Sequence, residues 1–383
     1  MRTFRLANIK DTLNILKFAN LNWGSEHPIL NYTEWFVYYY IDMTIGVPRF
    51  AICEEDNVIA AICGYILAAE DSDSGIWMSF LVADKKRPGA GMELIAHLSE
   101  LTGADRVACI NIKKNTIPMY RFLGWHTGQL DFYYRLADKE QYKIAQIQKK
   151  NIPESTINVP FSYKKIDGGF LQGNNLELGE TYPKKDISYV IKRYFQCPFY
   201  KYDVWQVTWT RTKKLLLVTR TMCVEGVSIL HVVDVIGDLK LISWCGSFFQ
   251  FLIEQAGAEY IDCYCTGVPT AYFEDAGMVK RLEEDDENII PTRLELPIQK
   301  INVDVYYCTN RVEDFVAFRG DGDFDRPFMP NTNNSENVAM EQQRSRLARG
   351  GGVKLKSFTG ILDAPAFYKT KSRSLPKDGG EAA

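Results

Sequence analysis

The sequence predicts an α/β (α+β) protein made of two similar halves, each a mixed central sheet flanked by helices. Apolar runs of strand length alternate with amphipathic runs of helix length through the first 320 residues. The segment 272–278 repeats the pattern of 120–125, where a tyrosine is followed by a glycine and a large apolar residue. A chain of 383 residues, 46% of them hydrophobic, is long enough for about two domains.

The first half is expected to open with helices and a hairpin. The predicted elements, in chain order, are a helix at 11–20, a further region at 25–40, two strands within 50–65 and a strand at 76–82. Asp56-Asn57 lies between the two hairpin strands, where residues that tolerate a tight turn are needed.

The stretch 81–92 passes from a strand through a basic, glycine-containing turn into a helix. Gly89 and Gly91 let the backbone bend and approach a ligand, while Lys86 and Arg87 supply positive charge. The helix that follows, which Gly103 should end, directs its first N–H groups at the same place. This composition predicts a phosphate site, although the turn is neither a P-loop nor the Rossmann fingerprint.

A short strand at 106–112 follows, and then Asn115 precedes a Tyr-x-x-x-Gly-aromatic helix. The whole order resembles the GNAT superfamily of acyl-CoA-dependent N-acetyltransferases. The resemblance implies that the amides of the turn bind the pyrophosphate of acetyl-CoA, and that the preceding strand splays from its neighbour to make the acyl slot. The residues that it assigns to acetyl-CoA are Leu81, Val82, Lys86, Arg87, Gly89, Ala90, Gly91, Met92 and Asn115.

The resemblance places Tyr120 at the general acid of the family. A departing thiolate needs a proton donor, and a phenol within hydrogen-bond reach can supply the proton. The alternative is that Tyr120 is part of the aromatic core in a chain with 13% aromatic residues. A base must also take a proton from an ammonium acceptor, and Glu26 and His27 are the candidates for this role. The aromatic run at 35–40 that follows them fits either a sugar-binding surface or the core.

The second half echoes the first and predicts a second GNAT-like domain in tandem. Its counterpart of the phosphate turn, at 234–239, has one glycine and the carboxylates Asp234 and Asp238 where the first half has basic residues. Carboxylates repel a pyrophosphate, so we expect no coenzyme A to bind there. A loop or helix-capping role is expected for Asp234.

The expected domains are a GNAT-like acetyltransferase domain at 1–136, a connector at 137–159, a degenerate GNAT-like domain at 160–320 and a mobile, disordered tail at 321–383. The alternating acids of 319–327 resemble a calcium loop, but the glutamate and flanking helices of an EF-hand are missing. A turn-rich strand exit is therefore favoured, and no metal is expected.

Composition limits the partners. A net charge of −3 argues against general nucleic-acid binding, and no apolar run is long enough to span a bilayer. Nine scattered cysteines indicate a reducing compartment, so we expect a cytoplasmic protein of undetermined oligomeric state.

The sequence thus favours acetyl transfer from acetyl-CoA to a small-molecule amine. A faint resemblance to proteins encoded with bacterial surface-polysaccharide genes suggests a nucleotide-linked amino sugar as acceptor. Two alternatives stay open: Fem-type aminoacyl transfer, and a non-catalytic binding module that keeps the fold.

Overall fold

The computed structural model of the chain describes residues 1–23, 33–69, 75–157, 161–173, 178, 181–210, 213–282, 287–294 and 298–326. Within these residues the first sheet has the strand order β1-β2-β3-β4-β5-β16-β6. Its strands are β1 Arg2–Leu6, β2 Phe50–Glu55, β3 Val58–Leu67, β4 Ile76–Ala83, β5 Val107–Ile112, β16 Tyr306–Thr309 and β6 His126–Gln129. The β2–β3 hairpin turns at Asp56 and Asn57, whose φ values of 54° and 61° confirm the predicted tight turn.

Helices cover both faces of the first sheet. On one face lie α4 (Ala90–Thr102) and α5 (Ile117–Phe122), which share an apolar cluster with alternate residues of the strands. On the other face, α1 (Thr12–Trp23) and α3 (Thr33–Tyr40) pack on the remaining strand side chains. Short 3₁₀ turns, η1 (Ile9–Asp11) and η3 (Lys114–Thr116), precede α1 and α5. As predicted, α4 ends at Gly103, with a φ of 70°.

The second sheet repeats the first. In the described part of the chain its order is β14-β7-β13-β12-β11-β10-β9, and β17 pairs with β13 beside this path. Its strands are β9 Ser162–Ile166, β10 Asp203–Thr208, β11 Lys214–Val224, β12 Val227–Gly237, β13 Ala258–Thr266, β7 Asp131–Leu136, β14 Val279–Lys280 and β17 Ala317–Phe318. β12 and β13 are a parallel pair like β4 and β5, and α8 (Gly246–Ala256) and α9 (Thr270–Asp275) take the places of α4 and α5.

Shorter elements complete the second half. They are η5 (Leu239–Trp244), α6 (Gly168–Gly173), α7 (Ile187–Val190), the π-helical turn η4 (Ile191–Phe195), and the pair β8 (Gln146–Ile147) and β15 (Asn288–Ile289). Residues of the expected connector are fastened to the second sheet, because the Glu259 carboxylate accepts hydrogen bonds from the backbone amides of Ile144 and Ala145 at 2.9 and 3.2 Å.

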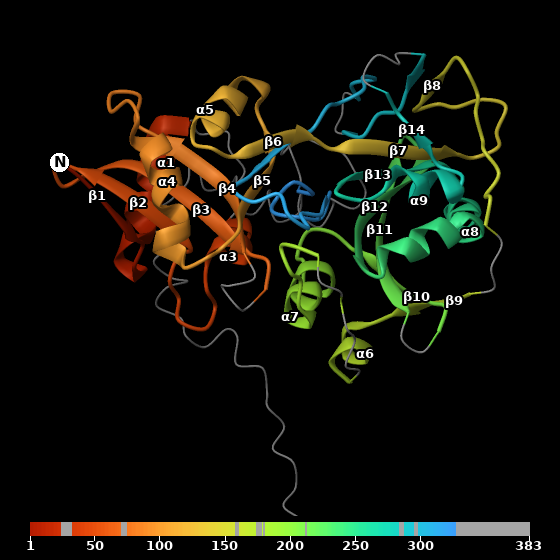
Figure 1. Ribbon diagram of the computed structural model, residues 1–383, viewed down its shortest axis with the longest axis horizontal. Helices are drawn as coiled ribbons and strands as arrows, with labels where there is room; N and C mark the ends of the chain where they lie inside the picture. The colour runs from red at the N-terminus through yellow and green to blue at the C-terminus, as the bar shows by residue number, and fades with distance from the viewer. Residues whose placement is uncertain are drawn as a thin grey trace, which may run out of the picture.

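The two sheets exchange one strand each. β16 comes from the second half of the sequence and lies between β5 and β6 of the first sheet. β7 comes from the first half and lies between β13 and β14 of the second sheet. β6 and β7 follow each other in the chain and run as one ribbon across both sheets (Figure 1). Strand pairing therefore crosses the expected boundary at residue 136 in both directions.

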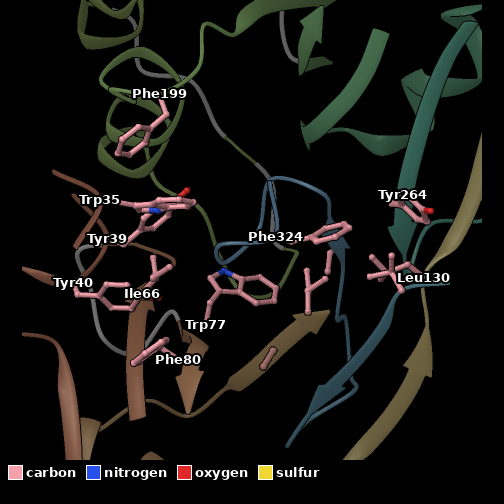
Figure 2. Close-up of a cluster of buried hydrophobic side chains, with 14 of the residues drawn as sticks. Trp35, Tyr39, Tyr40, Ile66, Trp77, Phe80, Leu130, Phe199, Tyr264 and Phe324 are labelled. Atoms are coloured by element: carbon pink, nitrogen blue, oxygen red, sulfur yellow. The ribbon is translucent and has the colours of Figure 1, made fainter. Parts of the chain in front are cut away.

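A shared apolar core joins the halves. The cluster beneath α1 and α3 continues into the second half through Tyr260 and Tyr264 of β13 and also contains Phe324. Figure 2 shows part of this cluster, with Trp77 between Phe80 and Phe324. Residues 321–326, which the sequence assigned to a mobile tail, instead lie in this interior: Asp321 is fully buried and Phe324 is 6% exposed. Residues 327–383 lie outside the described residues.

Candidate active site

The parallel strand pair of the first sheet opens part-way along its length. β4 and β5 pair at Ile76 with Val107 and at Trp77 with Ala108. β4 continues to Ala83 and pairs with β3 along the way. Beyond Trp77, no strand in the described part of the chain pairs with the β5 side of β4. We call this opening, between residues 78–83 of β4 and 109–112 of β5, the first wedge.

β4 carries an extra residue where the first wedge begins. Its register with β3 shifts between Met78 and Phe80, so Ser79 is the additional residue of a β-bulge. The Ser79 hydroxyl lies 2.7 Å from the phenol oxygen of Tyr40. Gly64 makes room for this contact, because a Cβ there would lie 2.9 Å from the Tyr40 ring. The sequence analysis did not identify Ser79 or its bulge.

The loop that follows β4 starts α4 with a left-handed glycine. Gly89 is the N-cap residue and has a φ of 86°, a conformation that side chains strain. Lys86 is exposed, and its amide donates to Asp84 Oδ1 at 2.9 Å. Gly91 is buried, and a Cβ on it would lie 3.2 Å from the Cβ of Ala83. The first turn of α4 therefore sits directly on the end of β4, with Ala90 to Met92 and their N–H groups beside the first wedge.

Two arginines fasten this loop, and the sequence analysis recognised one of them. The guanidinium of Arg87 donates to the backbone oxygen of Glu55 at 3.0 Å and faces the acidic β2–β3 turn. Arg2 is the arginine that was missed: it donates to the Pro88 oxygen at 2.8 Å and forms an ion pair with Glu93 in the first turn of α4. The Arg87 side chain thus holds the loop in place, and Arg2 adds a positive charge beside Gly89.

Tyr120 lies on the same face of the sheet as α4. It is 4% exposed, and it lies in the same buried cluster as Cys308, which contributes to its raised pKa. Burial, with Cys109, Cys308 and Cys63 close by, raises its pKa far above the ordinary value, so the phenol stays protonated at neutral pH. Cys63 is on β3 and Cys109 is on β5. A hydroxyl near both thiols lies over β4, beside the first wedge.

The other sequence-predicted residues are dispersed. Leu81 is half-buried on the α4 face, and Val82 is buried on the opposite face. Asn115 is exposed on η3. Glu26 and His27 lie outside the described residues. For the aromatic run of α3, the core alternative is correct at four positions: Trp35, Phe36, Tyr39 and Tyr40 are buried.

The parallel pair of the second sheet opens as well, but the chain fills that opening. β12 and β13 pair as far as Val232 with Cys263, and both strands then continue. β17 pairs with the end of β13, and the Gly320 amide donates to the Val233 oxygen at 2.7 Å. A Cβ on Gly320 would lie 2.3 Å from the Tyr194 hydroxyl. Residues 317–320 therefore occupy this second wedge, the counterpart of the first.

The filling segment is held by buried ion pairs. Lys185 Nζ lies 2.7 Å from Asp234 Oδ1 and 2.9 Å from Asp321 Oδ1. Asp234 is thus a fully buried strand residue that anchors the segment, and its expected capping role is wrong because β12 extends to Gly237. The cap is Asp238, which accepts from the Lys240 amide at 3.2 Å.

The alternating aspartates of this segment each form an ion pair with a different basic side chain. Asp321 pairs with Lys185, Asp323 with Arg326, and Asp325 with Arg220 at 2.7 Å. Their spacing therefore reflects three separate ion pairs. No group of three metal-ligating side chains comes together in the described residues.

Two further observations bear on the surroundings of the protein. None of the helices within the described ranges is sufficiently long and apolar to cross a membrane. All nine cysteines are free, and seven of them are buried.

Comparisons with known proteins concern the fold. No family model and no curated protein matches the chain. A solved GCN5-related N-acetyltransferase from Anabaena variabilis is 11% identical with a TM-score of 0.48, over 81% of this chain and 72% of that one. One from Kribbella flavida is 11% identical with a TM-score of 0.44, over 81% of this chain and 70% of that one. N-acetylglutamate synthase from Neisseria gonorrhoeae, complexed with coenzyme A and N-acetyl-glutamate, is 18% identical with a TM-score of 0.25, over 33% of this chain and 29% of that one.

Proposed function

We propose that the chain is a tandem GNAT-like protein whose first half transfers an acyl group, most simply acetyl from acetyl-CoA, to an amine. The observation that carries this proposal is the contrast between the two wedges. In the first, no strand of the described residues pairs between β4 and β5 beyond Trp77, the glycine-capped end of α4 lies at the mouth, and Tyr120 lies over it. The second is filled by residues 317–320.

The loop supplies the features that a pyrophosphate needs. The first turn of α4 offers backbone N–H groups and the positive end of a helix dipole, and the left-handed Gly89 leaves the approach clear of a side chain. Lys85 and Lys86 are exposed on the same loop, and Arg2 neutralises Glu93 beside it. In this proposal the unpaired side of β4 holds the pantetheine arm in the first wedge.

The reaction then follows from the position of Tyr120. The amine attacks the thioester carbonyl carbon, a C–N bond forms, and the C–S bond breaks. A thiolate leaving beside Tyr120 can take the phenol proton, because the phenol is un-ionised at neutral pH. The strand that carries Cys308 belongs to the second half of the sequence, so we infer that the second half serves the first as scaffold.

For the acceptor, we propose a small-molecule amine, and a nucleotide-linked amino sugar is the substrate class to test first. A cytoplasmic site of action, where acetyl-CoA and reduced thiols coexist, is part of the proposal and is supported by nine free cysteines. The test is release of free thiol from acetyl-CoA with a panel of nucleotide amino sugars, free amino sugars and polyamines. Thiol release that depends on one acceptor supports transfer. Binding of acetyl-CoA without release for any acceptor would favour the non-catalytic alternative.

A further inference from the structure

The segment that fills the second wedge continues into the first. After Gly320, Asp321 is held by Lys185, and the chain then passes Gly322. A Cβ on Gly322 would lie 3.5 Å from the Cβ of Trp77, which is the last residue of β4 that pairs with β5. Phe324 follows, and its ring centroid lies 6.0 Å from that of Tyr264 in the shared core. Residues 322–324 therefore cross the sheet where the first wedge opens.

Asp323 lies between these two contacts in the sequence. Its negative charge affects the pKa of a group on each face of the sheet. Burial first, and then the negative charge of Asp323, hold the pKa of Tyr40 well above its ordinary value. The pKa of Cys109 is also held well above its ordinary value, by burial first, then by Cys308 and then by the negative charge of Asp323. Tyr40 belongs to the face of α1 and α3, whereas Cys109 belongs to the face of α4 and α5. Asp323 directly follows Gly322, where a Cβ would contact Trp77 at the point where β4 and β5 separate, so we place its carboxylate at the opening between these strands.

The immediate surroundings of Asp323 suit a charged, polar ligand. Its side chain is 11% exposed and forms an ion pair with Arg326, which is 18% exposed. The Cβ of Trp77 lies next to Gly322, and the indole N–H of the same residue is buried without a hydrogen-bond partner in the described part of the chain. Buried donors are normally satisfied, so this N–H can serve a ligand oxygen.

We propose that Asp323 is the general base of the first wedge and takes a proton from the ammonium group of the acceptor. This inference rests on the proposed function and assigns to it a residue that the second half delivers. A carboxylate that also attracts the ammonium group would select positively charged amines. When the acceptor binds, its ammonium group takes the place of Arg326 as the ion-pair partner of Asp323.

The proton balance assigns each group one task. The acceptor ammonium gives one proton to Asp323, which passes it to solvent, and the uncharged amine attacks the thioester carbon. As the C–S bond breaks, Tyr120 gives its proton to the sulfur. The nitrogen of the intermediate loses a second proton, which restores Tyr120. The products are the amide and coenzyme A thiol, with one proton released.

Two small acceptors separate this role from a structural one. Ethanolamine is positively charged at neutral pH and needs a base, whereas hydroxylamine is uncharged and does not. The full chain and its Asp323→Asn, Asp323→Glu and Asp203→Asn variants are assayed for thiol release with each acceptor between pH 6 and 9 (a range of about three units, chosen to cross the pKa of typical bases). Asp203 is a matched control, because its carboxylate pairs with Lys165 on the second sheet. Calorimetry with acetyl-CoA accompanies each variant.

The expected result is a selective loss. Asp323→Asn should lower the ethanolamine rate by roughly 10² to 10⁴, with the hydroxylamine rate and acetyl-CoA affinity close to the parent. Its remaining ethanolamine rate should rise with pH in step with the uncharged amine, while Asp323→Glu keeps part of the activity. An equal loss with both acceptors, or none, would overturn the role of Asp323. A parent chain that binds no acetyl-CoA would contradict the proposed function itself, and this inference with it.

Discussion

Tyr120, on α5, and Cys308, on β16, lie in one buried cluster, and Cys308 helps to raise the pKa of the Tyr120 phenol. β16 is the strand that the second half of the sequence contributes to the first sheet. The proposed acid therefore packs with a strand that a fragment ending at residue 136 would lack. The same fragment would also leave β7 without its partner strands β13 and β14. The two halves form one folding unit at the level of strand pairing.

Replacing Tyr120 by Phe tests the proposed acid. The ring packing against Trp125 is kept, but the proton is lost. We expect turnover to fall by roughly 10² to 10⁴, measured as thiol release from acetyl-CoA, while coenzyme A affinity and the unfolding temperature stay close to the parent. Cys308→Ala is the matched control, because it removes a neighbouring thiol and leaves the phenol. Unchanged turnover in Tyr120→Phe would return Tyr120 to the aromatic core.

Two glycines of α4 allow a controlled test of the phosphate loop. Gly89 and Gly103 cap opposite ends of the helix, with φ values of 86° and 70°. Alanine at either position incurs the strain of a left-handed conformation, about 1 kcal/mol. A Cβ at Gly89 would lie 3.3 Å from Arg2 Nη1, whereas one at Gly103 meets nothing within 4 Å.

Gly89→Ala and Gly103→Ala should therefore lose similar amounts of stability in urea unfolding, but only Gly89→Ala should weaken coenzyme A binding in calorimetry. Equal affinity in the two variants would remove Gly89 from the site. Gly91 is unsuitable for this test, because its contact with Ala83 makes any larger side chain displace α4 from β4.

His231 makes stability depend on pH. Burial, the positive charge of Arg319 and a smaller effect of Arg220 lower its pKa from 6.5 to about 4, although Asp262 accepts its hydrogen bond at 2.7 Å. Below pH 6.5 the unfolded chain binds a proton that the folded chain refuses, so the folded state loses stability as the pH falls toward 4. Above pH 6.5 this contribution is constant. The full effect is about 3 kcal/mol.

His231→Asn lacks this titration. The free energy of unfolding of the parent, minus that of the variant, should therefore decrease between about pH 7 and about pH 4.5. Contributions from other groups, such as Asp321, are common to both proteins and cancel in the difference. A difference that stays constant over this range would show that His231 keeps an ordinary pKa in the fold.

Local features of the first half could be predicted from the sequence because each has a local cause. The turn at Asp56-Asn57, the glycine that starts α4 and the Gly103 cap depend on residues that tolerate positive φ, which is visible in the sequence. Tyr120 became a candidate because the order of segments around it resembles that of the GNAT superfamily, and its role stays a prediction. These are properties of a few consecutive residues.

The strand exchange and the base could not be predicted, because both depend on partners distant in the sequence. β16 is a four-residue strand whose neighbours, β5 and β6, lie in the other half of the chain. Asp234 lies in an apolar run and is buried because Lys185 neutralises it. Residues 321–326 have the composition of a loop, and the distant bases Lys185 and Arg220, which pair with Asp321 and Asp325, help to hold them in the interior. The sequence therefore placed them in a tail.

Titration of the full chain with coenzyme A tests the central claim most directly, because it requires no knowledge of the acceptor. The open first wedge and the filled second wedge predict one molar equivalent of binding, weakened by Gly89→Ala. Calorimetry that shows a single site with this dependence supports the account. Absence of binding, or a second equivalent, would contradict it, because the first result removes the donor site and the second requires an open wedge where residues 317–320 lie.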